Sequence, residues 1–233
     1  MTIGISENIK QSFAFTKENL IGKILNWVIL FVIALLSSQY LTSFIPDYTL
    51  ALILTAFSIL IQIILYGIIM RIYAGGEVTF AHFGTLIKKG FGYFVVYLVY
   101  CLPSFILMGV SVAVMLIPLS INPEAALTGA AAGMMILIPA LILLFLASLI
   151  ITPAAVNYAH STSLGGAFRI SEIFARIDNA GWGVYIFSFL IFAVIGMVLS
   201  ALTYIPYAGV FIFAIIISFM NILQAKYFAN LLS

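Results

Sequence analysis

Few residues of this chain have the types and spacing that chemistry requires. The two histidines, His82 and His160, stand in separate segments, and neither has a cysteine or a carboxylate at a spacing typical of metal ligands. Ser163 lies near His160, but no strand–turn–helix elbow and no third member of a nucleophilic triad accompanies the pair. The Gly75-Gly76 pair is too short for a phosphate-binding loop. We therefore expect no catalytic residue, no metal site and no cofactor.

The composition points the same way. Of 233 residues, 65% are hydrophobic and 7% are charged, whereas about a quarter are charged in an ordinary soluble domain. A water-soluble protein of this length would leave too much of that apolar surface exposed. The single cysteine, Cys101, excludes a disulfide framework and any multi-cysteine metal site. The sequence predicts an integral membrane protein, and it excludes a soluble enzyme, a disordered chain and a nucleic-acid binder.

Uncharged apolar runs define the membrane spans, because a transmembrane helix needs about 20 such residues. They predict a single membrane domain over residues 1–233 that is all-α and polytopic, with six transmembrane helices. Pro103 and Pro139 lie inside two of these helices, so we expect kinks there. The expected spans are about 24–45, 48–70, 91–118, 130–151, 184–203 and 208–228.

The basic residues predict the orientation. With six spans, all nine lysines and arginines lie on the side of both termini, and the opposite loops hold only the acids Asp47 and Glu124. Because cytoplasmic loops are rich in lysine and arginine, we expect a multi-pass cell-membrane protein with both termini in the cytoplasm. Aromatic residues such as Trp27 and Tyr204 fall near the expected interfaces, where such rings are favoured.

Segments on the same side as the termini have the pattern of amphipathic helices that lie on a membrane. In residues 164–178, apolar side chains recur at i, i+3, i+4 and i+7, and residues 179–181 are a plausible helix end. Residues 79–89 repeat this pattern, and residues 5–17 show a weaker version of it. We therefore expect two or three interfacial helices beside the spans.

Particular residues are expected to limit and stabilise these helices. Ser163 is the expected N-cap of the helix at 164–178, and Glu172 and Arg176 form an ion pair at i,i+4 spacing. Thr79 is the expected cap of the helix at 79–89, and Gly90 is its expected end.

Each expected interfacial helix precedes a pair of spans, which indicates an internal repeat. The three units would be roughly 1–74, 75–159 and 160–233. The pairs of spans end alike, with Arg71-Ile72-Tyr73-Ala74, Val156-Asn157-Tyr158-Ala159 and Lys226-Tyr227-Phe228-Ala229. The alternative is that aromatic and small residues recur there by chance, and the short matches leave both open.

Two segments resemble a known family. Residues 165–174 read Gly-Gly-Ala-Phe-Arg-Ile-Ser-Glu-Ile-Phe, and with Asn179 and the span after it they are similar to the domain of unknown function 4013 family. The loop at residues 71–77, with the aromatic residues that follow it, resembles the same family's loop. Those proteins are small multi-pass membrane proteins of archaea and bacteria. The resemblance implies a six-helix membrane protein and no assigned function. More distantly, residues 138–140 and the span after them resemble the membrane domain of glycerophosphodiester phosphodiesterases.

The polar side chains within the spans are neutral, which argues against a proton-coupled pump or a voltage sensor. Gln62 and Asn221 are candidates for lining a cavity, and the alternative for both is hydrogen bonding between helices, as for Asn26. Gly129 and Gly133 form a Gly-x-x-x-Gly pattern, for which packing within the chain is favoured over an oligomer interface.

Two functions from different classes remain. The first is a non-catalytic role in lipid association, or in support of another membrane complex. In that role Lys88, Lys89, Arg169 and Arg176 contact anionic headgroups. The partners would be membrane lipids, with a membrane protein or a second copy of the chain left open. The second function is a transporter, channel or lipid scramblase for an uncharged or amphipathic substrate. A transporter needs a polar-lined cavity that reaches the middle of the membrane, whereas a scaffold can have an exposed groove.

Overall fold

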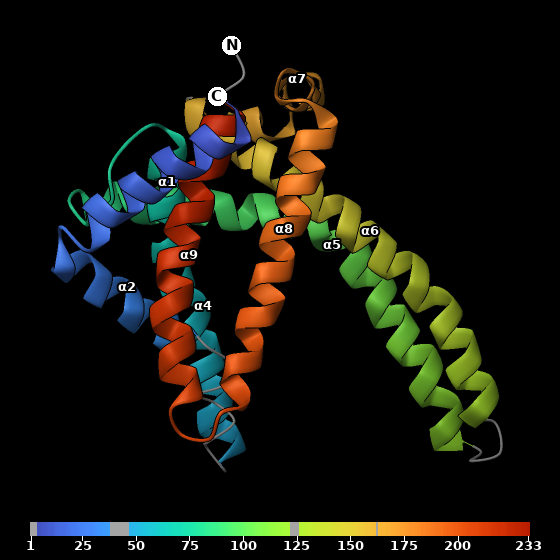
Figure 1. The fold of residues 1–233 in the computed structure, drawn as a ribbon. Coiled ribbons are helices and arrows are strands. Elements are labelled where there is room, and N and C mark those ends of the chain that lie inside the picture. Colours follow the sequence, from blue (N-terminus) through green and yellow to red (C-terminus); the bar gives the residue numbers. More distant parts are fainter. Residues whose placement is uncertain (1–3, 38–46, 122–125, 162) are drawn as a thin grey trace. The chain divides into compact units, whose positions relative to one another are not determined.

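The computed structural model describes residues 4–37, 47–121, 126–161 and 163–233 (Figure 1). The chain divides into two compact units. Unit 1 comprises Met1–Phe94 and Pro153–Ser233, and unit 2 is Val95–Thr152. The single membrane domain over residues 1–233 stays a prediction.

Within the described residues, five helices are long and apolar enough to cross a membrane. Their positions agree with the last five predicted spans, and the structure confirms the all-α polytopic membrane class. Many of their large apolar side chains are exposed, which a hydrocarbon solvent favours and water does not. The helices are α4 (Tyr48–Tyr73), α5 (Phe83–Ile121), α6 (Ala126–His160), α8 (Trp182–Ser200), which continues into η3 (Ala201–Tyr204), and α9 (Gly209–Leu231).

The first predicted span, residues 24–45, is described only in part. Its beginning is the helix α2 (Ile24–Leu36), and residues 38–46 lie outside the described part of the chain. The helix α1 (Ile5–Leu20) precedes α2 at an angle of 96°, and the two count as a sixth apolar span only when taken together. Gly22 lies at the bend, where a Cβ atom would be 2.5 Å from the carbonyl oxygen of Glu18.

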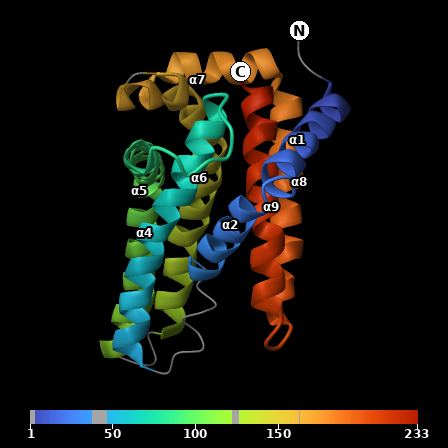
Figure 2. The same ribbon diagram turned by 90° about the vertical axis from the view of Figure 1, so that its left-hand side faces the viewer.

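The helix α9 is central to unit 1, since it contacts α1, α2, α4 and α8. Small buried side chains on α9 let these helices approach closely. Asn8 of α1 donates from Nδ2 to the carbonyl oxygen of Tyr227, at 3.1 Å, so the two ends of the chain lie at one end of unit 1 (Figures 1 and 2). The small buried residues of α9 are Gly209, Ala214, Ser218, Ala225 and Ala229.

The helix expected at residues 5–17 is confirmed as α1, but its buried face is a polar one. The apolar side chains of Ile5, Ile9 and Phe13 are 39%, 50% and 50% exposed. Short neutral polar side chains at i, i+4, i+8 and i+11 face the protein instead. Two of them bond to neighbouring segments, Asn8 to the carbonyl of Tyr227 and Asn19 to the amide of Val78, and the other two bond within α1. These buried residues are Asn8, Ser12, Thr16 and Asn19.

The prediction of a separate helix at residues 79–89 is wrong. The helix α5 begins at Phe83 and continues without a break through Gly90. Gly90 does not end a helix; a Cβ atom there would lie 2.0 Å from the carbonyl oxygen of Ile63, so this glycine lets α5 approach α4 closely. Thr79 does not cap a helix either, because its Oγ1 accepts a hydrogen bond from the amide of Ala81, at 3.2 Å.

The single helix expected at residues 164–178 is two helices. The short 3₁₀ helix η2 (Leu164–Phe168) is followed by α7 (Ile170–Ala180), and Ser163 makes no side-chain cap bond to η2. The stop after α7 is confirmed, since Gly181 has φ +85°, a conformation that favours glycine.

The prediction of a Glu172–Arg176 ion pair is also wrong. Glu172 pairs with Arg169, at 3.0 Å, because Asn157 of α6 lies between Glu172 and Arg176 and bonds to both.

Unit 2 is an antiparallel hairpin made by the parts of α5 and α6 within Val95–Thr152. Gly133 of α6 faces α5, and the Ser111 hydroxyl donates to its carbonyl oxygen at 2.7 Å. A Cβ atom at Gly133 would lie 2.3 Å from Cγ of Met115, and one at Gly129 would lie 2.9 Å from Cγ of Pro118. The structure therefore confirms that the Gly-x-x-x-Gly pattern packs within the chain.

The predicted repeat ends all lie in unit 1. Their tyrosines, Tyr73, Tyr158 and Tyr227, are all buried there. The threefold repeat itself stays a prediction.

Candidate functional site

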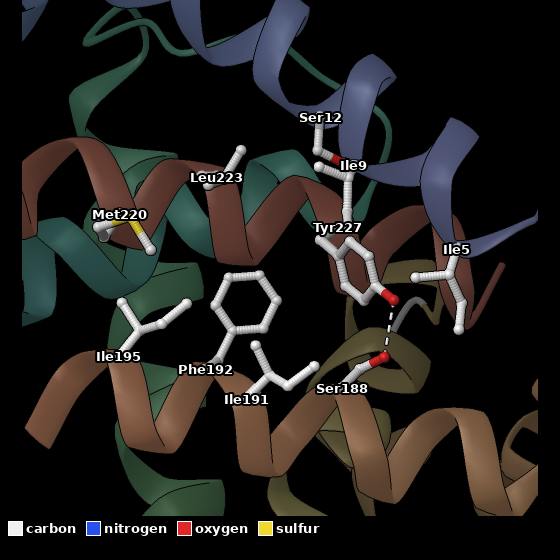
Figure 3. Close-up of a pocket in the computed structure, with 10 residues that line it drawn as sticks. All are labelled: Ile5, Ile9, Ser12, Ser188, Ile191, Phe192, Ile195, Met220, Leu223 and Tyr227. Carbon is white, nitrogen blue, oxygen red and sulfur yellow. Dashed lines mark hydrogen bonds between the residues drawn. The ribbon is translucent and has the colours of Figure 1, made fainter.

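A groove in unit 1 lies between α1, α8 and α9, with a cavity of about 140 Å³ (Figure 3). We call it the α1–α8–α9 groove. Apolar side chains line most of it, and three hydroxyl groups lie among them. The apolar residues are Ile5, Ile9, Ile191, Phe192, Ile195, Met220 and Leu223, and the hydroxyls belong to Ser12, Ser188 and Tyr227.

The groove exists because α8 packs on α9 through only a few residues. Ser188 Oγ and the Tyr227 hydroxyl share a hydrogen bond of 2.7 Å, drawn dashed in Figure 3. The ring of Phe192 lies 5.3 Å from that of Tyr227 and 5.7 Å from that of Phe228, measured between centroids. In all of α8 only Tyr185 and Ser188 are buried. The other side chains of α8 are not buried, and the space between α8 and α9 beside this contact forms the groove.

The residues that line the groove include no His, Asp, Glu, Lys, Arg or Cys. The hydroxyls of Ser188 and Tyr227 satisfy each other, and Ser12 Oγ donates to Asn8 Oδ1 at 3.2 Å. An apolar groove with its polar groups already paired favours an apolar occupant over water, because water would find few hydrogen-bond partners there.

The groove runs along the helices for the length of a short hydrocarbon segment. Ser188 and Ile195 are seven residues apart on α8, so they are separated by about 10 Å along the helix at about 1.5 Å per residue. Ser188 and Tyr227 lie near the start of α8 and the end of α9. The polar end of the groove therefore lies at the end of unit 1 that carries the termini.

The third wall, α1, contacts α9 through the rings of Phe13 and Phe219, 5.6 Å apart between centroids, and through a set of hydrogen bonds that we call the polar seam. It consists of Asn8, Ser12 and Asn230 with the backbone of Tyr227. Asn8 Oδ1 accepts from Ser12 Oγ and from Asn230 Nδ2, at 3.2 and 3.0 Å, while Asn8 Nδ2 donates to the carbonyl of Tyr227. The sequence analysis missed this seam; its signal was the four-residue spacing of short neutral polar side chains in a helix otherwise rich in charge.

A second polar cluster surrounds Asn157, near the end of α6. Its Nδ2 donates to the Gly166 carbonyl and to Glu172 Oε2, both at 2.8 Å, and its Oδ1 accepts from Arg176 Nε at 3.0 Å. Arg176 Nη1 also donates to the carbonyl of Leu232, at 2.7 Å. One asparagine therefore ties α6, η2 and α7 together, and Arg176 adds the end of the chain. All the hydrogen-bonding groups of the Asn157 amide are used.

Residues 50–206, more than half of the chain, match the family described as protein of unknown function (DUF4013). The chain belongs to the DUF4013 family. No curated protein and no solved structure matches it. In this DUF4013 protein the matched region contains the α8 wall of the groove, whereas α1 and α9 lie outside it. The more distant resemblance to glycerophosphodiester phosphodiesterases stays a prediction.

The basic residues predicted to contact headgroups have different surroundings in this DUF4013 protein. Lys88 is exposed, and the ammonium of half-buried Lys89 lies 4.7 Å from the centroid of the Tyr158 ring. Arg169 pairs with Glu172, and Arg176 is engaged by Asn157 and the chain end. Within the described residues, Lys88 and Lys89 are thus the two of these four that make no ion pair with a carboxylate and no hydrogen bond to a carbonyl.

The residues predicted to line a cavity are not part of the groove. Gln62 and Asn221 are half-buried, on α4 and α9, and neither lines the α1–α8–α9 groove. The expected hydrogen bonding of Asn26 is confirmed, since its Nδ2 donates to the carbonyl of Val78 at 2.8 Å. Across the described ranges, no three His, Cys, Asp or Glu side chains gather as metal ligands would.

The Asn157 cluster predicts an acid-sensitive attachment of α7. Hydrogen bonds from Asn157 and Arg169 hold the pKa of the Glu172 carboxyl below its ordinary value. A carboxylate with a lowered pKa stabilises the folded state above the unfolded-state pKa of about 4.3, and this contribution is lost as the pH falls through the folded-state pKa. The unfolding midpoint should therefore fall more steeply as the pH is lowered from about 5 to 3 in the wild type than in Glu172→Gln. The fluorescence of Trp182, whose ring lies 5.7 Å from that of Phe174 on α7, reports the transition in a Trp27→Phe background. Identical pH profiles in the two proteins would contradict the assignment.

Proposed function

We propose that this DUF4013 protein is a non-catalytic membrane protein that associates with a membrane lipid, and that one acyl chain of the lipid occupies the α1–α8–α9 groove. The single observation that carries this proposal is the groove itself: its walls include two apolar spans, and its hydroxyls are already paired.

An acyl chain is the occupant that best fits the surroundings of the groove. The spans α8 and α9 form two of its walls, and large apolar side chains of α8 such as Leu190 and Val194 are 44% and 57% exposed. A bilayer around these helices supplies hydrocarbon chains at high concentration. Burying each CH₂ group contributes about 0.8 kcal/mol when the alternative is water. In a bilayer that gain is absent, so tight packing against the groove walls has to favour one chain over its neighbours.

The same observations favour lipid association over the transporter. A transporter for an uncharged or amphipathic substrate requires a polar path, and Gln62 and Asn221 were its candidate residues. Neither lines the groove, whose exposed walls are apolar. The groove instead has the character expected of a protein that holds a lipid or supports another membrane protein, and lipid is the occupant to which we commit.

The basic residues support an inner-leaflet location for the polar end of the groove. All nine lysines and arginines belong to unit 1, and the groove's hydroxyls lie toward the end that carries both termini. By the excess of basic residues in cytoplasmic segments, that end faces the cytoplasm. Lys88, Lys89, Arg169 and Arg176 would then lie on the side of the anionic headgroups.

A tryptophan in the groove should displace the lipid. Ile191 lines the groove and is 41% exposed, whereas Leu190, its neighbour on α8, is 44% exposed and does not line it. Native mass spectrometry of gently solubilised protein should show a bound lipid in the wild type and in Leu190→Trp, and a several-fold lower lipid occupancy in Ile191→Trp, because the indole fills the space of the acyl chain.

Equal lipid occupancy in all three proteins would contradict the groove as the binding site. A wild-type chain that carries no lipid but keeps a second polypeptide would also contradict the proposal, and would favour the accessory role.

Cysteine labelling tests the orientation. In a Cys101→Ala background, Tyr204→Cys lies in η3, where the wild-type tyrosine is 87% exposed, and Ser233→Cys lies at an exposed position two residues after the end of α9. A membrane-impermeant maleimide should label Tyr204→Cys in right-side-out vesicles and Ser233→Cys only in inverted vesicles. The reverse pattern would place the termini outside.

A further inference from the structure

A second pocket in unit 1, with a cavity of about 170 Å³, lies between the end of α4, the first turns of α5 and Ala159 near the end of α6. It shares no lining residue with the α1–α8–α9 groove. Two basic residues, Arg71 and Lys89, line it together with Thr85 and several apolar residues. We call it the Arg71–Lys89 pocket.

Close contact between two helices brings these charges together. A Cβ atom at Gly67 of α4 would lie 2.2 Å from the carbonyl oxygen of Leu86, and one at Gly90 of α5 would lie 2.0 Å from that of Ile63. The two backbones therefore touch at both glycines. Arg71 follows Gly67 by one helical turn and Lys89 precedes Gly90 directly, so the contact fixes both basic residues at the same pocket.

The guanidinium of Arg71 is held in place but keeps donors for a ligand. Its Nη1 and Nη2 donate to the carbonyls of Thr79 and Ala81, at 2.7 and 2.8 Å. A guanidinium has five N–H groups, so these two bonds leave further donors. Carbonyl oxygens fix the position of the group without neutralising its charge.

Neither basic residue of the pocket has an acidic partner. In the parts of the chain that the structure describes, the ion pairs are Lys23–Glu77 and Arg169–Glu172. The ammonium of Lys89 lies over the face of the Tyr158 ring, 4.7 Å from its centroid. Two half-buried basic residues thus line one pocket without an acidic partner among the described residues, and exposed Lys88 lies next to Lys89 in the chain. Such an arrangement favours an anion, because a charge removed from water needs a partner.

We infer that the Arg71–Lys89 pocket binds a phosphate group, with Arg71 and Lys89 as its charged donors and the Thr85 hydroxyl beside them. A guanidinium and an ammonium are the side chains that bind phosphate oxygens best, and charge-assisted hydrogen bonds are the strong ones. The phosphate belongs to a lipid headgroup or to a soluble phosphate. The inference deepens the proposed lipid association by naming a headgroup chemistry, and it uses residues separate from the groove.

Thermal unfolding of reconstituted protein tests the inference. The wild type is compared in phosphatidylcholine vesicles, in vesicles that also contain phosphatidylglycerol, and in phosphatidylcholine vesicles with inorganic phosphate. Phosphatidylglycerol should raise the unfolding midpoint of the wild type. Lys89→Gln should weaken the apparent affinity for phosphatidylglycerol about tenfold, as expected for the loss of one charge-assisted hydrogen bond.

Matched variants separate the pocket from general attraction to a charged surface. Lys10→Gln removes the same charge from an exposed site on α1 and should respond as the wild type does. Lys89→Arg should restore the response. Ile191→Trp in the groove should also respond normally, so failure of the groove proposal and failure of this one are distinguishable. Stabilisation by inorganic phosphate, lost in Lys89→Gln, would support the pocket with a soluble ligand.

Two results would overturn the inference. One is a wild type that neither phosphatidylglycerol nor phosphate stabilises. The other is a Lys89→Gln protein that melts normally in phosphatidylcholine alone and responds to phosphatidylglycerol as strongly as the wild type, which would assign the effect to surface charge. If Lys89→Gln does not fold, Lys89→Arg and Lys10→Gln decide. The inference then fails if phosphatidylglycerol stabilises both of these variants less than the wild type and to the same extent.

Discussion

A chain in a bilayer must satisfy its polar groups from within, since hydrocarbon offers them no hydrogen bonds. In unit 1 this constraint is met by a few asparagines. Asn8 joins α1 to α9 through Tyr227 and Asn230. Asn157 joins α6 to η2 and α7, and through Arg176 to the end of the chain. Further hydrogen bonds reach α9 from two other helices: Trp27 Nε1 of α2 donates to Ser218 Oγ at 3.0 Å, and Ser188 of α8 shares one with Tyr227. Apolar contacts alone do not distinguish a neighbouring helix from lipid. The asparagines, together with these hydroxyl and indole groups, therefore favour particular helix neighbours over lipid.

The groove and the pocket both follow from this arrangement. The polar seam holds α1 on the face of α9, where its apolar side chains Ile5 and Ile9 cover the space beside α8. Glycine contacts between α4 and α5 bring Arg71 and Lys89 to one pocket. In each case a short polar residue or a glycine sets how closely two helices pack, and this packing places the side chains that line the site. A change at Asn8 should thus affect a site that Asn8 does not line.

The spans were predictable because the bilayer imposes length and apolarity on them, and five agree with helices in the described residues. The ends and partners were not predictable in the same way. Gly90 was interpreted as a helix end, whereas its absent side chain serves a contact with Ile63, which no local pattern shows. Glu172 and Arg176 have ideal spacing for an ion pair, yet Asn157 from another helix lies between them. The buried face of α1 was missed because neutral polar residues in a charged helix are also typical of a solvent-exposed face.

The central claim is that hydrogen bonds of the polar seam help to hold α1 on α9, in addition to aromatic contacts such as that between Phe13 and Phe219. A double-mutant cycle of Asn8→Ala and Asn230→Ala, measured by reversible unfolding in mixed micelles, tests it most directly. Gln11→Ala and Asn230→Ala form the control cycle, since exposed Gln11 donates to Glu7 of the same helix. The account predicts a coupling energy of about 1 kcal/mol between Asn8 and Asn230 and additive effects in the control. Additivity of Asn8 and Asn230 within about 0.3 kcal/mol would contradict it.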